Sequence, residues 1–404
     1  MQKAPPDVVA PPPGNPRFPL FDSLRAIAAL AIVVTHTAGL STFNSSNDVL
    51  GPFTARADVG VTVFFVISGF LLYRPFVSAR YEGRAAPRAI AYARRRLLRI
   101  VPAYWLALTV LAVWPGLTGV FGGHFWVYYL YVQNWRPQWI VTGLGPAWSL
   151  DVEMGFYLVL PLFAWLLART LAGRPLRTQV RVELVVLAAL GLASLAARTY
   201  QHAHQPNWTL PNTLPGTLLW FALGMGLAVA SAALHGRPER ELPRAVRLVV
   251  RRPSLAWLAA FGFLLWSTRI GLPRAFPYRY GAWGWFGQHL LYGAFSFCLV
   301  LPAVFGDRAG GLPRRVLAWR PLAWLGLVSY GIYLWHLPLA VKMNEWLDGS
   351  YVLILLATTA AAVACATASY YLVERPLLRF KEGLPRRRAA ALSATAPAPA
   401  GRAG

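Results

Sequence analysis

The sequence is poor in charged residues, which make up only 13% of its 404 residues. A typical soluble domain carries about 25%. Hydrophobic residues account for 56% of the chain, and apolar stretches of about 20 residues, enough to span about 30 Å of hydrocarbon, recur from residue 20 to residue 374. The deficit of charge therefore indicates an integral membrane protein and leaves no room for a separate soluble domain.

Cysteine and the common catalytic motifs are also scarce. Cys298 and Cys365 lie in apolar stretches and offer neither a disulfide framework nor metal-ligand spacing. His202 and His204 have no ligand partners nearby in the sequence. The phosphate-binding loop, the nucleophile elbow and the zinc motif H-E-x-x-H are all missing. We therefore expect no metal and no permanently bound cofactor.

Acidic residues are few: 15 stand against 39 basic ones, which gives a net charge of +24. The arginines lie in the short connections between apolar stretches and do not form a basic face. That distribution is typical of cytoplasmic loops under the positive-inside rule, so it argues against nucleic-acid binding.

The apolar stretches divide the chain into a membrane domain and two tails. Residues 1–17 are rich in proline and lack the apolar core of a signal peptide, and residues 381–404 are rich in Arg, Ala and Pro. Both are expected to be disordered cytoplasmic tails around a transmembrane domain at 18–380. Because the stretches are too long for barrel strands, the fold is predicted to be an all-α bundle of about ten transmembrane helices. The expected spans are 20–40, 59–79, 100–118, 147–168, 182–199, 215–234, 254–271, 284–305, 322–343 and 351–373.

Arginine counts predict the orientation of these spans. Alternate connections carry seven, four, six and four arginines, whereas those between them carry one, one, one, three and none. The alternation holds throughout only if both termini are cytoplasmic. Counting the short aromatic segment 122–135 as a crossing would invert every later loop. It is therefore predicted to be interfacial or re-entrant at the outer side, as an aromatic belt, a stacking platform for an acceptor, or both.

Ionisable groups within the spans are costly and often mark function. Arg25 and His36 share the first span, eleven residues apart, which returns to within about 20° of the same helix face and separates them by about 16 Å along the axis. Glu153 lies at a depth similar to that of His36 and is expected beside it, fixing its tautomer as a general base would require. The alternatives are snorkelling for Arg25, a structural hydrogen bond for His36 and an interfacial acid for Glu153.

Two further groups could join them. His336, in the outer half of the ninth span, is either a second catalytic group or a structural hydrogen-bond partner. Arg96 and Arg99 share a helix face at the cytoplasmic mouth of the third span, and arginine forks suit phosphate groups. They are interpreted either as a site for a cytosolic polyphosphate such as coenzyme A or as a contact with anionic lipid.

Several segments together resemble the membrane acyltransferase-3 family. Arg25 and His36 match its R-x10-H signature, and the stretch from Gly60 to Phe70 matches G-x-x-x-F-F-x-x-S-G-F. The resemblance covers about residues 18–380 in six ordered motifs. The other four are Arg95-Arg96-Leu-Leu-Arg99-Ile-Val-Pro102-Ala-Tyr104-Trp105, Trp148-Ser-Leu-Asp-Val-Glu153-Met-Gly-Phe-Tyr157, Ser329-Tyr-Gly-Ile-Tyr-Leu-Trp-His336 and Val373-Glu374-Arg375-Pro376.

The resemblance implies a ten-span enzyme that moves an acyl group from cytosolic acyl-CoA to a hydroxyl of a carbohydrate, an envelope glycan or glycolipid, or a macrolide. It implies Arg25, His36 and Glu153 as catalytic residues. Met154-Gly155 departs from members that carry a second polar residue there. The implied substrate-binding residues are Arg96, Arg99, Ser68, Trp148, Tyr157 and His336.

Two other functions fit the buried polar residues. A transporter or flippase for a glycan or lipid precursor would use Arg, His and Glu as a proton relay, although no inverted repeat is evident. A non-catalytic membrane partner would tolerate the loss of Arg25 and His36. The expected location is the plasma membrane of a bacterium.

Overall fold

The computed structural model describes residues 20–140, 142–204, 209–275, 281–306, 310–348 and 350–378 of the chain. The two predicted tails, 1–17 and 381–404, lie outside the described residues. Within the described part, nine helices are long and apolar enough to cross a membrane. They are α1 (Leu20–Leu40), α4 (Gly60–Tyr81), α5 (Ala89–Leu111), α8 (Trp148–Thr170), α9 (Leu176–His204), α10 (Leu214–Ala233), α13 (Ala282–Val304), α15 (Arg320–Trp346) and α16 (Tyr351–Ser369).

The tenth expected span is a bent pair of helices. Helix α12 (Pro253–Ser267) has only 15 residues, and α11 (Arg244–Arg251) meets it at 99°. The break falls at Arg252, whose backbone is not helical, because a residue that precedes a proline is pushed out of the α region. The prediction of a helical bundle with about ten spans is confirmed, with nine to ten candidates in the described residues.

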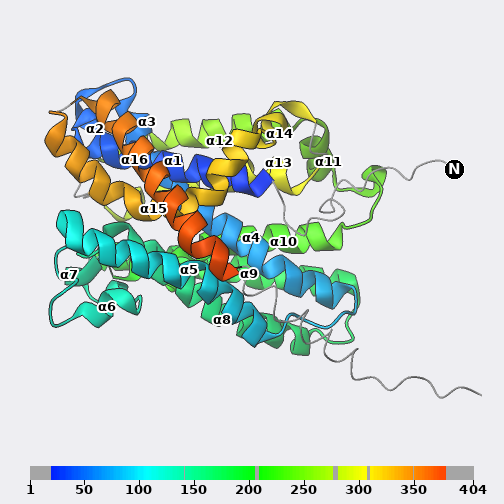
Figure 1. Cartoon of the computed structure of the whole chain (residues 1–404). Coiled ribbons are helices and arrows are strands. Elements are labelled where there is room, and N and C mark those ends of the chain that lie inside the picture. Colours follow the sequence, from blue (N-terminus) through cyan, green and yellow to red (C-terminus); the bar gives the residue numbers. More distant parts are fainter. Residues whose placement is uncertain are drawn as a thin grey trace, which may run out of the picture.

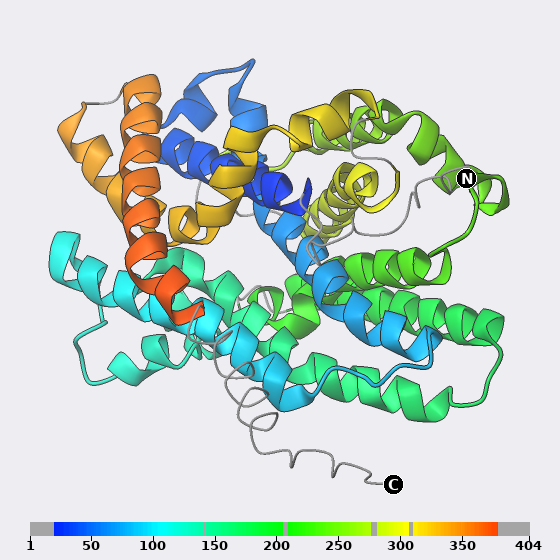
Figure 2. The same ribbon diagram turned by 45° about the vertical axis from the view of Figure 1, so that its right-hand side comes forward.

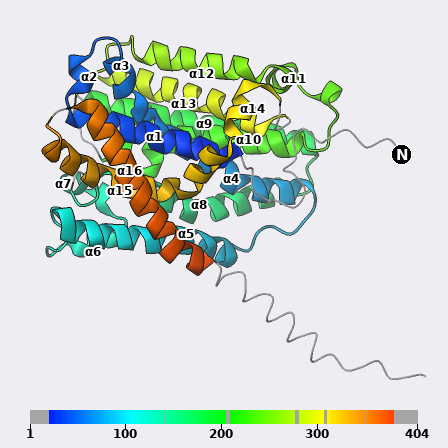
Figure 3. The same ribbon diagram turned by 45° about the horizontal axis from the view of Figure 1, so that its top comes forward.

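The short helices gather at the two ends of the bundle (Figures 1 and 3). At one end, Arg274 forms an ion pair of 3.3 Å with Asp48, and Phe43 stacks on Tyr351. These four residues lie in or beside three different connections, and all three connections were predicted to be on the outer side. The short elements at this end are α2 (Phe43–Ser46), α3 (Gly51–Ala55), η1 (Ala57–Val59), α6 (Phe125–Tyr129), η3 (Gln133–Trp135) and α7 (Pro137–Ile140).

The arginine-rich connections meet at the opposite end, where α11 and α14 (Gly311–Leu317) lie. The fully buried guanidinium of Arg314 donates hydrogen bonds to five backbone carbonyls, among them Val249 and Val250 of α11 and Phe305 after α13. The predicted alternation of loops is thus reproduced in space. Which end faces the cytosol remains a prediction.

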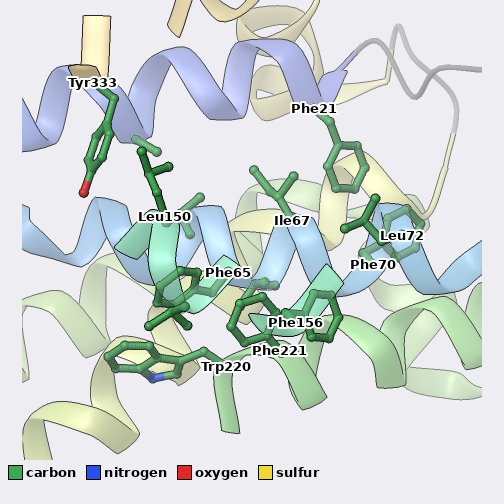
Figure 4. Packing of buried hydrophobic residues seen from close by; sticks show 14 of the residues in the cluster. Phe21, Phe65, Ile67, Phe70, Leu72, Leu150, Phe156, Trp220, Phe221 and Tyr333 are labelled. Carbon is green, nitrogen blue, oxygen red and sulfur yellow. The ribbon is translucent and has the colours of Figure 1, made fainter. Parts of the chain in front are cut away.

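Helix α4 is central to the bundle. It packs on α10 and α1, and α9 packs along the side of α10 (Figure 2). The end of α16, with η7 (Tyr370–Glu374), reaches across to α5. Beneath α4, Phe221 stacks on Phe65 and on Phe156, with ring centroids 4.7 and 4.2 Å apart (Figure 4). Lipid tails are as apolar as these side chains, so close packing of rings and small residues holds the helices together.

Helices α1 and α15 approach closely at one point. A Cβ atom added to Gly326 would overlap the backbone carbonyl of Asp22. Glycine therefore allows a backbone-to-backbone contact between these two helices, which carry His36 and His336.

Candidate functional site

Helix α1 presents two of the predicted site residues to the interior. The helix is continuous from Leu20 to Leu40, so the expected rise of about 16 Å between Arg25 and His36 applies. Asp22, one turn before Arg25, forms a 3.2 Å ion pair with its guanidinium. Arg25 keeps only 16% of its side-chain surface exposed, so this cation is held within the bundle and does not snorkel freely to water.

A cavity opens beside Arg25, between α1, α4, α5, α8 and α15. Three guanidiniums line it, because Arg96 and Arg99 enter from α5 next to Arg25. Glu153 is the single acidic residue in its lining. The cavity is therefore positively charged, and a bound anion would neutralise the excess charge. The remaining polar lining residues are Ser68, Ser149, Tyr157, Ser329, Tyr330 and Tyr333.

Glu153 is held from two sides. Ser68 of α4 donates a hydrogen bond to one of its carboxylate oxygens, and Tyr157, one turn further along α8, donates to the other at 2.8 Å. The Nε atom of Arg96 is buried without a hydrogen-bond partner in the described structure. A buried donor without a partner is costly, so this nitrogen is well suited to an incoming acceptor such as a phosphate oxygen.

His36 is paired with another histidine. Its Nδ1 atom lies 2.8 Å from Nε2 of His336, and Nδ1 of His336 lies 2.7 Å from the backbone carbonyl oxygen of Tyr333. The expectation that Glu153 would orient His36 is therefore corrected, because the two carboxylate oxygens of Glu153 accept hydrogen bonds from Ser68 of α4 and from Tyr157. Similar depth in two helices did not imply contact, since α15 packs on α1 at this level.

Tyr333 lies between the cavity and the histidine pair. Its ring lines the cavity, and the ring centroid of His336 is 5.7 Å away. Its hydroxyl lies within hydrogen-bonding distance of Ser149 and of the Pro146 carbonyl, at 2.7 and 2.8 Å. In Figure 4 the ring projects between α1 and α4. Neither His36 nor His336 is among the residues that line the cavity.

The other predicted site residues divide into two groups. The cavity brings together Arg25, Ser68, Arg96, Arg99, Glu153 and Tyr157. Trp148 lies outside it, packed edge-on against Phe65 with ring centroids 6.2 Å apart. Ser149 and Tyr333 were not predicted as site residues, although both fall within the motifs that carry the family resemblance. Among the described residues, no group of three His, Cys, Asp or Glu side chains could hold a metal ion.

The aromatic segment 122–135 does not cross the bundle, as predicted. It folds back along α5, where Tyr104 and Trp105 donate hydrogen bonds of 2.9 Å to the carbonyls of Tyr128 and Tyr129. Asn134 then ties the segment to the start of α8, through its side-chain bond to the Trp148 carbonyl. Its exposed rings, such as Phe125 and Trp126, suit an interfacial belt.

The fold and this site define a polytopic helical membrane protein with a cationic cavity and a histidine pair in its interior. The chain belongs to acyltransferase family 3. The model of that family, described as an acyltransferase domain, matches residues 19–371.

The chain is similar to two O-acetyltransferases. A peptidoglycan O-acetyltransferase of Listeria monocytogenes is 24% identical over 385 residues, covering 89% of this chain and 55% of the relative. An O-acetyltransferase of Staphylococcus aureus is 25% identical over 389 residues, covering 90% and 58%. This chain thus spans little more than half the length of these relatives.

A putative membrane-bound transacylase of Komagataeibacter xylinus is closer in length. It is 28% identical over 394 residues, which cover 92% of this chain and 86% of the relative. No solved structure matches the chain. None of these relatives is named as a transporter, so they lend the flippase alternative no support.

Proposed function

We propose that the protein is a membrane O-acyltransferase that moves an acyl group from cytosolic acyl-CoA to a hydroxyl of a carbohydrate acceptor. The observation that carries the proposal is the placing of a cationic cavity and a histidine pair along one helix, α1. Family membership and the O-acetyltransferase names of two relatives support the reaction class. An envelope glycan is the favoured acceptor because one of those relatives is named for peptidoglycan.

The donor enters at the arginine end of the cavity. Phosphate groups of coenzyme A bind Arg96 and Arg99, with Arg25 further inside, because arginine forks pair with phosphate in two parallel hydrogen bonds. The unpartnered Nε of Arg96 supplies one of the donors. The thioester then extends past Tyr333 toward His36.

The chemical step is a direct transfer. The oxygen of the acceptor hydroxyl attacks the thioester carbonyl carbon, His36 takes the hydroxyl proton, and the carbon–sulfur bond breaks. The proton passes to the departing thiolate, which leaves as coenzyme A with a free thiol. General-base assistance of this kind is typically worth about 10²–10⁴ in rate.

The test uses purified full-length protein in proteoliposomes with acetyl-CoA and a panel of glycan acceptors. Release of the coenzyme A thiol and acylation of the acceptor are both measured. His36→Ala is expected to lower acyl transfer by about 10²–10⁴-fold, the full worth of a general base. His289→Ala serves as the control for loss of an interior histidine, because His289 is fully buried but lies on α13, away from the cavity. Near-wild-type transfer by His36→Ala would remove His36 from the mechanism.

A further inference from the structure

The two histidines meet edge to edge. The His36 and His336 ring planes are 20° apart, their centroids are 5.0 Å apart, and the nitrogen–nitrogen distance is 2.8 Å. Stacked rings cannot bring two ring atoms so close, so the contact runs in the ring planes. In-plane approach aims the lone pair of one nitrogen at the N–H of the other, as a directional hydrogen bond requires.

The backbone carbonyl of Tyr333 decides which nitrogen carries each proton. A carbonyl oxygen only accepts, so Nδ1 of His336, 2.7 Å from it, must carry the hydrogen. In a neutral ring the other nitrogen, Nε2, then has a lone pair and accepts. Its partner, Nδ1 of His36, must therefore donate. Along this chain of two bonds, Nε2 of His36 is left with an unshared lone pair.

The Tyr333 carbonyl can accept this bond although it lies within α15, because a carbonyl oxygen has two lone pairs. His336 is fully buried, whereas His36 keeps some exposure, so the chain of bonds begins in the protein interior and ends at the more accessible ring.

We propose that His336 is a positioning residue that fixes His36 as the Nδ1–H tautomer, with Nε2 as its basic nitrogen. Its part in acyl transfer rests on the proposed function, but the tautomer does not. A neutral histidine in this role differs from a carboxylate. A carboxylate would favour the protonated form of His36, whereas His336 orients the His36 ring without favouring that form. His36 therefore remains neutral and ready to accept the hydroxyl proton. Once His36 is protonated, its bond to His336 becomes charge-assisted and stronger.

The tautomer is tested directly by ¹⁵N nuclear magnetic resonance of histidine-labelled full-length protein in lipid bilayers. The His36 signals, assigned by their loss in His36→Ala, are expected to show a protonated Nδ1 and an unprotonated Nε2. Free neutral histidine prefers the opposite arrangement. Protonated Nε2 on His36 in the wild-type protein would overturn the proposal, and this outcome needs no variant of His336 to fold.

Two variants then test what the bond does. His336→Leu removes the acceptor, so His36 is expected to revert to Nε2–H, and the turnover number is expected to fall about tenfold or more with the KM for acetyl-CoA unchanged. His336→Gln keeps an oxygen that can accept the His36 proton and should restore much of the rate and the tautomer. His289→Leu is the control for loss of a buried histidine.

The outcomes separate the two proposals. Wild-type protein that shows the expected tautomer but releases no coenzyme A would overturn the proposed function and leave the tautomer assignment intact. Active protein in which His336→Gln behaves like His336→Leu in rate and tautomer would overturn the positioning role of His336.

Discussion

At the scale of single residues, hydrogen bonds and ion pairs determine the charge of the site. Glu153 accepts hydrogen bonds from Ser68 and Tyr157. It is also the single acidic residue in a cavity lining that holds three guanidiniums. The cavity therefore favours anions. Arg25 has Asp22 as a partner, whereas the Nε of Arg96 has none.

Arg96→Ala is expected to weaken donor binding more than chemistry. Hydrogen bonds to charged groups are worth about 1.5–3 kcal/mol, so the KM for acetyl-CoA should rise by about 10–100-fold with little change in turnover number. Steady-state kinetics in proteoliposomes measures both. Arg94→Ala is the matched control, since Arg94 is exposed on the same helix and does not line the cavity. A lowered turnover number at unchanged KM would instead assign Arg96 to the transition state.

Several residues selected from the sequence come together in the structure, but their partners were not predicted. Arg25, Arg96, Arg99, Glu153, Ser68 and Tyr157 do line one cavity. Spacing along one helix gives the face and depth of a side chain, which is why Arg25 and His36 were chosen. It does not tell which neighbouring helix that face meets. The pairing of His36 with His336, rather than with Glu153, depends on the packing of α15 on α1.

At the scale of helices, close contact between helix backbones determines which helices pack together. A Cβ on Gly224 of α10 would overlap the carbonyl oxygen of Val66 in α4, whereas one on Gly226 would meet only Leu184 at 3.8 Å. Small residues at such crossings let backbones touch and increase van der Waals contact. The α4–α10 crossing also supports the stacked rings of Phe65 and Phe221.

Gly224→Ala is therefore expected to destabilise the bundle, because α4 and α10 must separate to admit the methyl group. Overpacking of this kind typically costs about 1–3 kcal/mol, which a thermal-unfolding assay in detergent would register as a lowered Tm. Gly226→Ala, two residues away on the same helix, should leave the Tm unchanged or slightly higher. Equal Tm values for the two variants would show that the crossing is not tight.

At the scale of the whole molecule, the hydropathy pattern was sufficient to predict the helical bundle. Nine of the ten predicted spans have a matching helix in the described residues. The stretch 254–271 was less well predicted, since α12 already ends at Ser267 and the chain bends by 99° between α11 and α12. Arginine counts identified which connections share an end, and the ion pair between Arg274 and Asp48 agrees with that grouping.

The predicted orientation is tested by cysteine labelling in a Cys298→Ala, Cys365→Ala background. Ser46→Cys lies in an exposed connection at the arginine-poor end, and Ala86→Cys in an exposed connection at the arginine-rich end. A membrane-impermeant maleimide applied to intact cells should label the first and reach the second only after permeabilisation. The reverse result would place both termini outside.

Helix α1 also acts as a ruler. Under the proposed function, the donor is gripped near Arg25 and reacts near His36, and both side chains belong to one unbroken rod whose rise between them is about 16 Å. The distance from grip to reaction is therefore fixed by the backbone and cannot adapt to the donor. A carrier arm of the wrong length would deliver its carbonyl short of His36 or beyond it. The acyl group lies beyond this fixed distance. The spacing of Arg25 and His36 therefore selects for the length of the carrier, whereas the space around the histidine pair selects the acyl chain.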